Sequence, residues 1–471
     1  MFDSSWLNLS VDGFSGKPAV LSFDLEEGVY GDDLLVVNFL SQGSLPSSII
    51  GKEASLSFEF GGRKEFFNGV VTGCLAKQSP SSASMTTLKI KTLRHLIDKE
   101  KKHAVYCNSD IEEITRSILG KAKVSSVKYG FNSFHKADFK IQYNESDLAF
   151  LQRIFEDGGI IEFVKHSEGK SELVISDGDD FPAFASASDS IFVDSSIEIT
   201  GDGNVFYGHG HVPARPGMSF DAFGETFIVC SVSHIGSQGA AFGIKDENEG
   251  YSCRVVAFSK RMLGSLPRRK AKPQVPGVIV ARTEGFKDSP AALDSEGRYI
   301  IRMPFDEENP DMASSAPVHL AQSFAGENCG VHFPLRRGTP VLVAFEDGDI
   351  DKPIALGALP KDTHRGPAGD KNSFQNILRT SGGVGLVFDD KAKSLDIEAP
   401  ESISSKAGKK LGLESDELSV EGKKKGVFKT AGGVKISLDD SSGVLKMEAP
   451  SDIVLKAGGK IVFQSKSVEQ N

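Results

Sequence analysis

The chain has 471 residues, which allows about three domains of the usual size. Its net charge of −10 and its pI of about 5.6 argue against a nucleic-acid-binding protein, whose surface would be basic. The five cysteines are too far apart for a metal knuckle, and their odd number argues against a complete disulfide framework. We therefore expect reduced, buried thiols at Cys74, Cys107, Cys230, Cys253 and Cys329.

The first residues, MFDSSWLNLS, contain no basic stretch followed by a long apolar run. A run of about 18 or more apolar residues occurs nowhere in the chain. We expect the protein to fold in a reducing cytosol and to carry no Sec-type export signal.

Alternating apolar and polar residues predict a series of strands up to about residue 98. Clusters of Gly, Ser and Pro separate the runs, and this spacing predicts a small barrel. The predicted strands are Ala19–Leu25, Leu34–Leu40, Ala54–Phe60, Glu65–Ala76 and Met85–Thr92.

The apolar period then changes to that of a helix. One helix is predicted from Ile111 onward, after the cap Asn108-Ser109-Asp110, and a second at Asp147–Asp157, after Ser146-Asp147. Gly158 and Gly159 end the second helix. Strand patterns return at residues 160–165 and 172–176 and continue through about residue 260.

The stretch Leu266–Pro273 is rich in Pro and basic residues and predicts a linker. After it come about five strand patterns, the number in an OB-type barrel. They are Gly277–Ala281, Arg298–Met303, Pro317–Ala321, Thr339–Phe345 and Ile354–Gly357. A second linker, Pro360–Asn372, follows.

The C-terminal segment contains a tandem repeat. Residues 379–410 recur as residues 429–460, with 15 of 32 aligned positions identical. The segment 370–471 is nearly neutral, with 16 Lys plus Arg against 15 Asp plus Glu. Each copy predicts a serpentine of short strands, because apolar residues alternate with polar ones at Val434, Ile436 and Leu438, at Leu445 and Met447, at Ile453 and Leu455, and at Ile461 and Phe463.

One apolar face per repeat can be covered only by neighbouring strands. Two repeats are too few to bury such a face within one chain, so the pattern predicts that other chains take part. Several copies that wind round a common axis would pair every strand edge. A single-chain β-solenoid is the alternative, although a solenoid usually needs three or more repeats.

Residues 142–160, which begin Gln142-Tyr143-Asn144-Glu145-Ser146, resemble the VgrG family, the spike proteins of bacterial type VI secretion. The resemblance resumes at residues 292–306 and 319–357 and continues into the repeats, in the family's order. It covers essentially the whole chain. One departure is Phe324, where the family commonly has Trp.

The resemblance implies a mainly β chain in three parts. Residues 1–265 would form a phage-tail-hub-like domain of two β-barrels, with a small α/β insertion whose helices lie at about 108–157. Residues 273–360 would form an OB-fold collar. Residues 370–471 would form a needle, a triple-stranded intertwined β-helix built by a homotrimer.

In such a needle the alternating aliphatic residues would point inward and form the trimer seam. The predicted seam is Val384, Leu386, Phe388, Leu395, Ile397, Ile403, Val434, Ile436, Leu438, Leu445, Met447, Ile453, Leu455, Ile461 and Phe463. A tip partner would bind at Ile461, Phe463 and Val468.

The resemblance implies a trimeric spike at the tip of a type VI secretion tube, which punctures target membranes and carries a PAAR-type tip protein or effectors. Tube and baseplate proteins would be partners at the hub end, and the target membrane would be a transient one. The spike would assemble in the bacterial cytoplasm and then be secreted into the medium or a target cell. A hub spike of a phage tail or of an extracellular contractile particle is a related alternative. A single-chain β-solenoid adhesin or glycan-binding protein is the alternative from another class.

Candidate chemical sites are weak. His209-Gly210-His211 could offer two imidazoles to a metal, but a turn between strands explains the motif better. Asp347, Asp349 and Asp351 alternate as in a calcium loop, yet the required Gly is absent, so we expect a solvated hairpin turn. We expect no catalytic residue, cofactor or metal site, and no enzyme activity.

Overall fold

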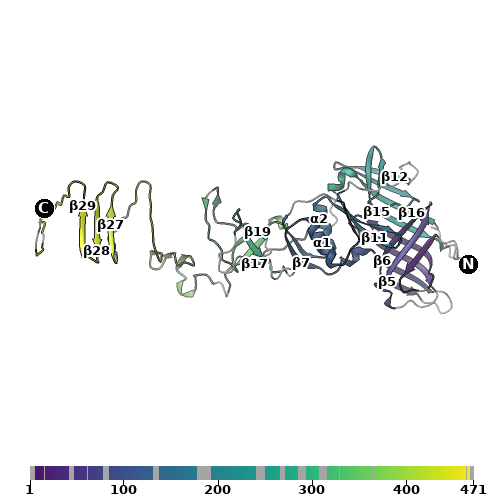
Figure 1. The fold of residues 1–471 in the computed structure, drawn as a ribbon, viewed down its shortest axis with the longest axis horizontal. Helices are drawn as coiled ribbons and strands as arrows, with labels where there is room; N and C mark the ends of the chain where they lie inside the picture. The colour runs from purple at the N-terminus through teal and green to yellow at the C-terminus, as the bar shows by residue number, and fades with distance from the viewer. Residues whose placement is uncertain are drawn as a thin grey trace. The chain divides into compact units, whose positions relative to one another are not determined.

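The computed structural model describes residues 6–14, 16–41, 47–60, 62–77, 84–130, 137–177, 192–239, 250–265, 271–284, 293–306, 316–327, 329–361, 365–462 and 464–466. It divides into two compact units, residues 1–366 and 367–471 (Figure 1). Within the described ranges, every helix is too short or too polar to cross a membrane.

An 11-stranded antiparallel sheet dominates the first unit. The pairing of β2 with β15 joins the N-terminal strands to a group from residues 192–259 (Figure 1). The five predicted N-terminal strands are confirmed to within a few residues, whereas the sequence pattern did not predict β1. The order is β1 (Leu7–Val11), β4 (Glu53–Phe60), β5 (Arg63–Lys77), β6 (Ser84–Lys91), β3 (Leu34–Ser41), β2 (Ala19–Gly28), β15 (Glu225–Ser237), β16 (Gly250–Ser259), β13 (Asn204–Gly210) and β12 (Phe192–Ile199), and β14 (Ser219–Ala222) pairs with β15.

Alternate residues of these strands point into one hydrophobic core. In β3, for example, Leu35, Val37 and Phe39 are fully buried. Trp6, the single tryptophan of the chain, packs against this core, with its ring centroid 5.8 Å from that of Phe60. Its fluorescence therefore reports on the packing of this sheet.

Two helices and a small sheet enclose a second core. α1 (Ile111–Lys121) begins at Asp110, whose carboxylate accepts the Glu113 N–H, and α2 (Asp147–Asp157) begins at Ser146. Both predicted helices are confirmed. The sheet consists of β10 (Ile161–Ser167), β11 (Lys170–Ser176) and β8 (Val127–Gly130).

The five strands predicted before the repeats form one sheet, with bounds within a few residues of those expected. Its order is β19 (Ala316–Val318), β18 (Tyr299–Arg302), β17 (Ile279–Thr283), β22 (Pro340–Phe345) and β23 (Pro353–Ala358). We call residues 271–361 the collar.

A two-stranded ribbon that the sequence pattern did not predict, β7 (Lys102–Ser109) with β9 (Ala137–Glu145), belongs to the core of the collar. Its Val105 and Ile141 cluster with Tyr299 and Val341 of the five-stranded sheet. Because β9 leads directly into α2, this ribbon connects the helical layer to the collar through buried apolar contacts.

Asp351, in the turn between β22 and β23, adds polar contacts at this junction. Its carboxylate lies 3.2 Å from Nη1 of Arg153 in α2, 3.3 Å from Nζ of Lys140 and 3.2 Å from the backbone N of Ile141. Arg153 also pairs with both carboxylate oxygens of Glu145 at 3.0 Å. The hairpin turn is confirmed, but the expectation that it is solvated is wrong for Asp351, whose side chain is only 9% exposed because these donors hold it.

The cysteines are free in the structure. Cys230 and Cys253 are buried, as expected. Cys107 is half-buried, and Cys74 and Cys329 are exposed, so the expectation of five buried thiols is met in full only by Cys230 and Cys253 and is wrong for Cys74 and Cys329.

Glu27 of β2 is the centre of a buried charge cluster in the large sheet. Arg215 forms an ion pair with it, His234 Nε2 lies 3.1 Å from its Oε2, and His166 Nε2 lies 3.5 Å from its Oε1. Arg215 also contacts Glu65 of β5 at 3.2 Å. The cluster therefore fastens β2, β5, β10 and β15 to one another.

The cluster sets unusual proton affinities. Burial alone would raise the pKa of Glu27, but Arg215 and the two histidines outweigh it and lower this pKa to about 2. Burial lowers the pKa of His166 to about 3, against the attraction of Glu27. His166 is therefore a neutral ring, and because its Nδ1 accepts the Asn68 N–H, its own proton lies on Nε2, toward Glu27.

We expect Glu27→Gln to destabilise the large sheet by about 3 kcal/mol, because the buried Arg215 loses its closest charge partner. Urea unfolding followed by Trp6 fluorescence measures the loss. Glu59→Gln, at an exposed position of β4, is the control and should leave the midpoint unchanged. Equal urea midpoints for the two variants would contradict the stabilising role that we assign to the Glu27–Arg215 ion pair.

We also expect a pH dependence with a defined sign. Unfolded His166 takes up a proton near pH 6.5, while the folded ring stays neutral down to about pH 3, so stability falls as the pH drops through this window. Glu27 acts in the same direction below about pH 4.5, because its folded pKa is about 2. Asp33, whose pKa burial raises to about 7, acts in the opposite direction.

The variant His166→Gln isolates the contribution of His166 to this pH dependence, because His234, whose pKa burial also lowers, is unchanged in it. Its Trp6 unfolding midpoint should lose less between pH 7.5 and pH 4.5 than that of the unaltered chain. If the unfolding midpoints of the two proteins fell equally between pH 7.5 and pH 4.5, His166 would not be held neutral in the folded protein.

Candidate interaction face of the repeats

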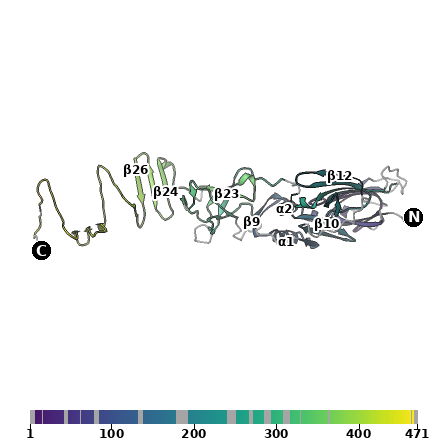
Figure 2. The same cartoon turned by 90° about the horizontal axis from the view of Figure 1, so that it is seen from above.

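Each repeat forms its own three-stranded antiparallel sheet in the unit of residues 367–471. The two sheets have the same register, shifted by the period of the sequence: Leu386 pairs with Ile397 in one, and Ile436 with Met447 in the other. The first sheet (Figure 2) contains β24 (Gln375–Arg379), β25 (Gly385–Asp389) and β26 (Ser394–Glu398), and the second (Figure 1) β27 (Lys425–Lys429), β28 (Lys435–Asp439) and β29 (Val444–Glu448).

Turn residues fix this register. Gly383 and Gly433 adopt φ of 83° and 90°, and a Cβ at either would lie 3.3 Å from the ring of the proline that follows the third strand. At the next turn the Asp389 carboxylate accepts the N–H groups of Lys391 and Ala392 at 2.9 and 2.8 Å, and these bonds lower its pKa. Each sheet therefore keeps its side-chain alternation in place.

The alternation gathers large apolar side chains on one side of each sheet, as the sequence predicts. We call this side the repeat face. In the first sheet it comprises Leu378, Leu386, Phe388, Leu395 and Ile397, and in the second Phe428, Ile436, Leu438, Leu445 and Met447.

The repeat face is uncovered in a single chain. Among its large side chains, Ile436 is 36% exposed and Leu445 58% exposed, and most of the others lie between these values. Soluble monomers rarely leave such a contiguous apolar surface in water. A three-stranded sheet also needs a packed apolar face for stability.

The opposite side of each sheet carries charged side chains together with a few smaller aliphatic ones, such as Val387 and Val444. Lys435 and Lys446 contact Glu448 at 3.5 and 2.5 Å, and Arg379 lies 3.6 Å from Glu398. Exposed pairs of this kind contribute little to stability, but they keep this side hydrated. Each sheet thus presents one side suited to water and one suited to another apolar surface.

The remaining predicted seam residues lie outside the paired strands. Val384 and Val434 occupy the turn before the middle strand and are about half exposed. The strands expected around Ile453–Leu455 and Ile461 are absent from the described part of a single chain, so that expectation is wrong for the isolated chain. Ile403, Ile453, Leu455 and Ile461 are all exposed there, and Phe463 and Val468 lie outside the described residues.

Several members of the apolar set were not among the predicted seam residues. Leu378 and Phe428 lie on the repeat face and are one period apart. Leu411 and Leu413 precede Ile461 and Phe463 by the same fifty-residue period, and both are more than 60% exposed. Extending the repeat alignment in both directions would have found all four.

The two histidines that the sequence offered as metal ligands do not form a metal site in the structure. His209 lies within β13, which ends at Gly210, and not in a turn, so our expectation of a turn is wrong for this residue. His211 Nδ1 lies 2.7 Å from the Tyr251 carbonyl oxygen. Nowhere in the described ranges do three or more His, Cys, Asp or Glu side chains gather closely enough to hold a metal ion.

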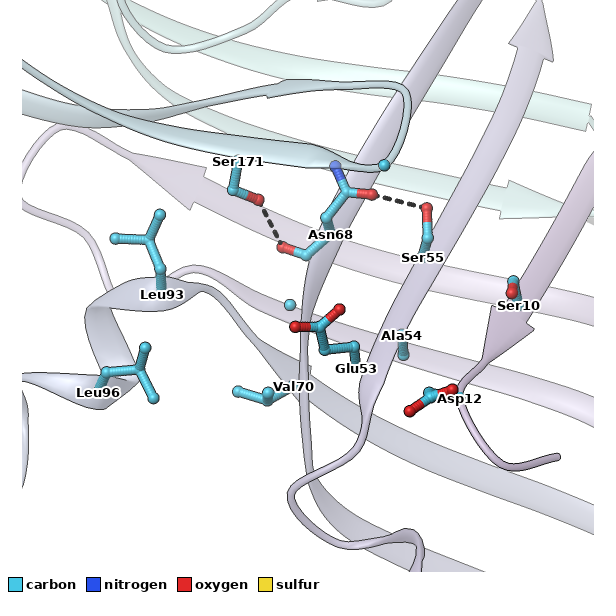
Figure 3. A pocket seen from close by; sticks show the side chains of 12 residues that line it. Ser10, Asp12, Glu53, Ala54, Ser55, Asn68, Val70, Leu93, Leu96 and Ser171 are labelled. Carbon is cyan, nitrogen blue, oxygen red and sulfur yellow. Dashed lines mark hydrogen bonds between the residues drawn. The ribbon is translucent and has the colours of Figure 1, made fainter. Parts of the chain in front are cut away.

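A cavity of about 390 Å³ lies beside β4 and β5 in the first unit (Figure 3). Asp12 and Glu53 line it on one side and Leu93 and Leu96 on another. Asn68 borders it, with its Oδ1 accepting the Ser55 hydroxyl at 2.7 Å. The described residues that line it include no histidine, cysteine or basic side chain, so we assign it no chemistry.

Two family models match the chain. Residues 34–206 match the phage tail baseplate hub (GPD) family, and residues 291–359 match the type VI secretion system/phage-baseplate injector OB domain. The first spans much of the large sheet and the helical layer, and the second spans most of the collar.

The curated relatives include type VI secretion system spike proteins and a toxin. The actin cross-linking toxin VgrG1 of Vibrio cholerae is 31% identical over 195 residues, which cover 38% of this chain and 18% of that protein. The type VI secretion system spike protein VgrG1c of Pseudomonas aeruginosa is 21% identical over 442 residues, which cover 73% of this chain and 60% of that protein. The chain thus spans less than two thirds of these relatives.

Solved structures share the fold. An Escherichia coli component of the type VI secretion system, described as similar to T4 bacteriophage tail proteins, has a TM-score of 0.58 at 19% identity and covers 74% of this chain and 99% of its own. A chain of the Francisella PdpA-VgrG complex has a TM-score of 0.53 at 10% identity, and the match covers 94% of this chain and 88% of that one.

A hub-like sheet followed by an OB collar defines the class of phage-baseplate hub and spike proteins. Within this class the two matched domains, the curated relatives and the solved structures together support a VgrG-type spike protein. The resemblance noted in the sequence is therefore confirmed.

Proposed function

We propose that three copies of this chain form the spike of a type VI secretion machine, and that the repeat face is the surface on which they meet. The observation that carries this proposal is the repeat face itself: a fixed register holds large apolar side chains in water in a single chain. Contact between copies removes this surface from water and pairs the free strand edges.

Each of the three predicted parts has its own role in the proposed spike. Residues 1–265 act as the hub that faces the secretion tube and baseplate, residues 273–360 act as the collar, and residues 370–471 act as the needle. Residues 453–462 contain apolar side chains but no paired strand, which suits a segment whose partners are the same segments of other copies.

We further propose that the spike acts mechanically and without chemistry of its own. The needle end, around Ile461, Phe463 and Val468, carries a PAAR-type tip protein or an effector through the target membrane. The spike assembles in the bacterial cytoplasm and leaves through the type VI machine. That VgrG has been solved in complex with PdpA supports binding of a further protein to such a spike. The phage tail baseplate hub match keeps a phage tail spike as the second candidate.

The oligomeric mass tests the proposal directly. Multi-angle light scattering of the full chain should give three times 50.5 kDa. A chain ending at Gly366 should associate more weakly, because it lacks the repeat face. A stable monomer of the full chain would refute the trimer.

A pair of neighbouring substitutions in β29 tests which side faces the partner. Leu445→Asp should prevent trimer formation, because it places carboxylates in an apolar contact at a cost of several kcal/mol each. Val444→Asp is the matched control: Val444 is 48% exposed and Leu445 58%, but Val444 lies on the charged side. Equal effects of the two variants on the scattering mass would show that the repeat face is not the contact.

A further inference from the structure

A second cavity lies in the first unit, where the helical layer meets the collar. Its volume is about 550 Å³, against about 390 Å³ for the cavity in Figure 3. Three stretches of the chain line it: residues 98–101 before β7, the end of β9 with one face of α2, and residues 271–274 at the start of the collar. Pockets for small organic ligands typically measure about 300–1,000 Å³, so this cavity has the size of a binding site.

One face of α2 forms a wall of this cavity. The lining positions on this helix and at its N-cap recur every three or four residues, which places them on the same side. They are Ser146, Ala149, Gln152, Arg153 and Glu156. The apolar residues of α2 pack on the other side, in the second core. The cavity therefore lies against the polar face of a helix that its apolar face holds in place.

Gln152 is the unusual residue of this wall. It is only 6% exposed, yet its Nε2 meets no acceptor in the part of the chain that the structure describes. Arg153 beside it is just as buried, but it donates to both carboxylate oxygens of Glu145 and to the Ile141 carbonyl oxygen. A buried amide donor without an acceptor is costly and therefore rare in native folds. The Gln152 amide thus requires an acceptor oxygen on a molecule that enters the cavity.

The charges of the lining balance. Its described residues include three basic side chains and three acidic ones: Lys99, Lys101 and Arg153, and Asp98, Glu145 and Glu156. A ligand with a large net charge of either sign meets no complementary excess here. A neutral ligand that both donates and accepts hydrogen bonds matches this lining better.

The amides of the lining favour the same kind of ligand. Asn144 and Gln274 line the cavity together with Gln152, and each amide offers N–H donors and a carbonyl acceptor. A hydroxyl group likewise donates one hydrogen bond and accepts others. A molecule with many hydroxyl groups therefore finds a partner for each in amides, carboxylates and ammonium groups.

Tyr143 adds an apolar surface to this polar lining. Its ring is held by edge-to-face contacts with His103 and Phe305, whose ring centroids lie 4.8 and 5.3 Å away. An aromatic ring packs well against C–H groups. A sugar ring has hydroxyl groups at its edge and C–H groups on its faces, so it matches both parts of the lining.

We propose that this cavity binds a saccharide, with a sugar oxygen as the acceptor for the Gln152 amide and sugar hydroxyls as donors to the carboxylates around it. The ligand lies between the polar face of α2 and the start of the collar. A mechanical spike needs no such ligand, so this inference goes beyond the proposed function and depends on neither the trimer nor the needle.

Calorimetric titration of the full-length protein tests the binding. The probes are maltotriose, cellotriose and the N-acetylglucosamine trimer, which differ in linkage and in the acetamido group. At least one of them should bind with a Kd of about 1 mM or tighter. Sodium phosphate and sodium acetate are the charged comparison probes, and neither should bind.

Gln152→Leu separates a ligand-binding role from a structural one. It removes the amide at a similar side-chain volume, so binding of the probe should weaken at least tenfold. Because the Nε2 donor is unpaired in the free protein, the urea midpoint should stay the same or rise. Gln322→Leu, the same change at an exposed position of the collar outside the cavity, should leave binding unchanged.

A second substitution keeps the test decisive if the leucine variant fails to fold. Gln152→Asn retains the amide but withdraws it from the cavity by one methylene group. It should also weaken binding of the probe at least tenfold, because the donor no longer reaches the same sugar oxygen.

The reactivity of lysines locates the bound probe. Lys99 and Lys101 are exposed and line the cavity. The bound saccharide should slow their acetylation by sulfosuccinimidyl acetate at least threefold, as measured by peptide mass spectrometry. Lys371, exposed in the other unit, is the control and should react at the same rate with and without the probe.

Each outcome decides the inference. Absence of binding by all three saccharides, equal binding by the Gln152→Leu protein, or binding without protection of the two lysines overturns it. Phosphate or acetate that binds and protects the same lysines shows an anion site and also overturns it. The scattering mass decides the trimer separately, so either proposal can fail while the other stands.

Discussion

The central constraint on this chain is that its repeat face has no cover within one molecule. In a globular domain, an apolar sheet face packs against a helix or a second sheet of the same chain. Here the turns fix the register of each small sheet so firmly that Leu386 and Phe388, or Ile436 and Leu438, stay together on one side. The architecture of the C-terminal unit is thereby determined by what must lie against that side.

The first unit meets a different demand, which is stiffness. Its helical layer and collar are not independent domains joined by a flexible linker, because the β7–β9 ribbon places Val105 and Ile141 inside the core of the collar. Asp351 and Arg153 add a charge pair with little exposure at the same junction. A buried ion pair is weak evidence for stability, but removing one partner leaves an unpaired buried charge, so the pair resists separation of the two parts. The Glu27 cluster does the same for four strands of the large sheet.

Local patterns predicted most elements well. Period and caps located both helices: the stretches Asn108-Ser109-Asp110 and Ser146-Asp147 are capping patterns, and the structure shows that Asp110 and Ser146 are the N-caps. The repeat alternation identified the repeat face. The β7–β9 ribbon was missed because its strands are separated by α1 and contain many polar residues. The Glu27–Arg215 pair joins positions 188 residues apart, which no local window reveals. Residues 453–455 show the reverse error: the alternation is that of a strand, but a strand also needs a neighbour, and the single chain offers none there.

The self-contained turns of the repeats have an evolutionary consequence. Each copy supplies its own left-handed residue at the second turn, Lys393 in one and Gly443 in the other, and its own glycine and proline at the first. No bond within one sheet depends on the other sheet for its register. Gain or loss of a fifty-residue block by recombination would therefore add or remove a whole three-stranded sheet and leave the side-chain alternation of every remaining strand intact. The length of the C-terminal unit can thus vary without any change to the fold of each repeat.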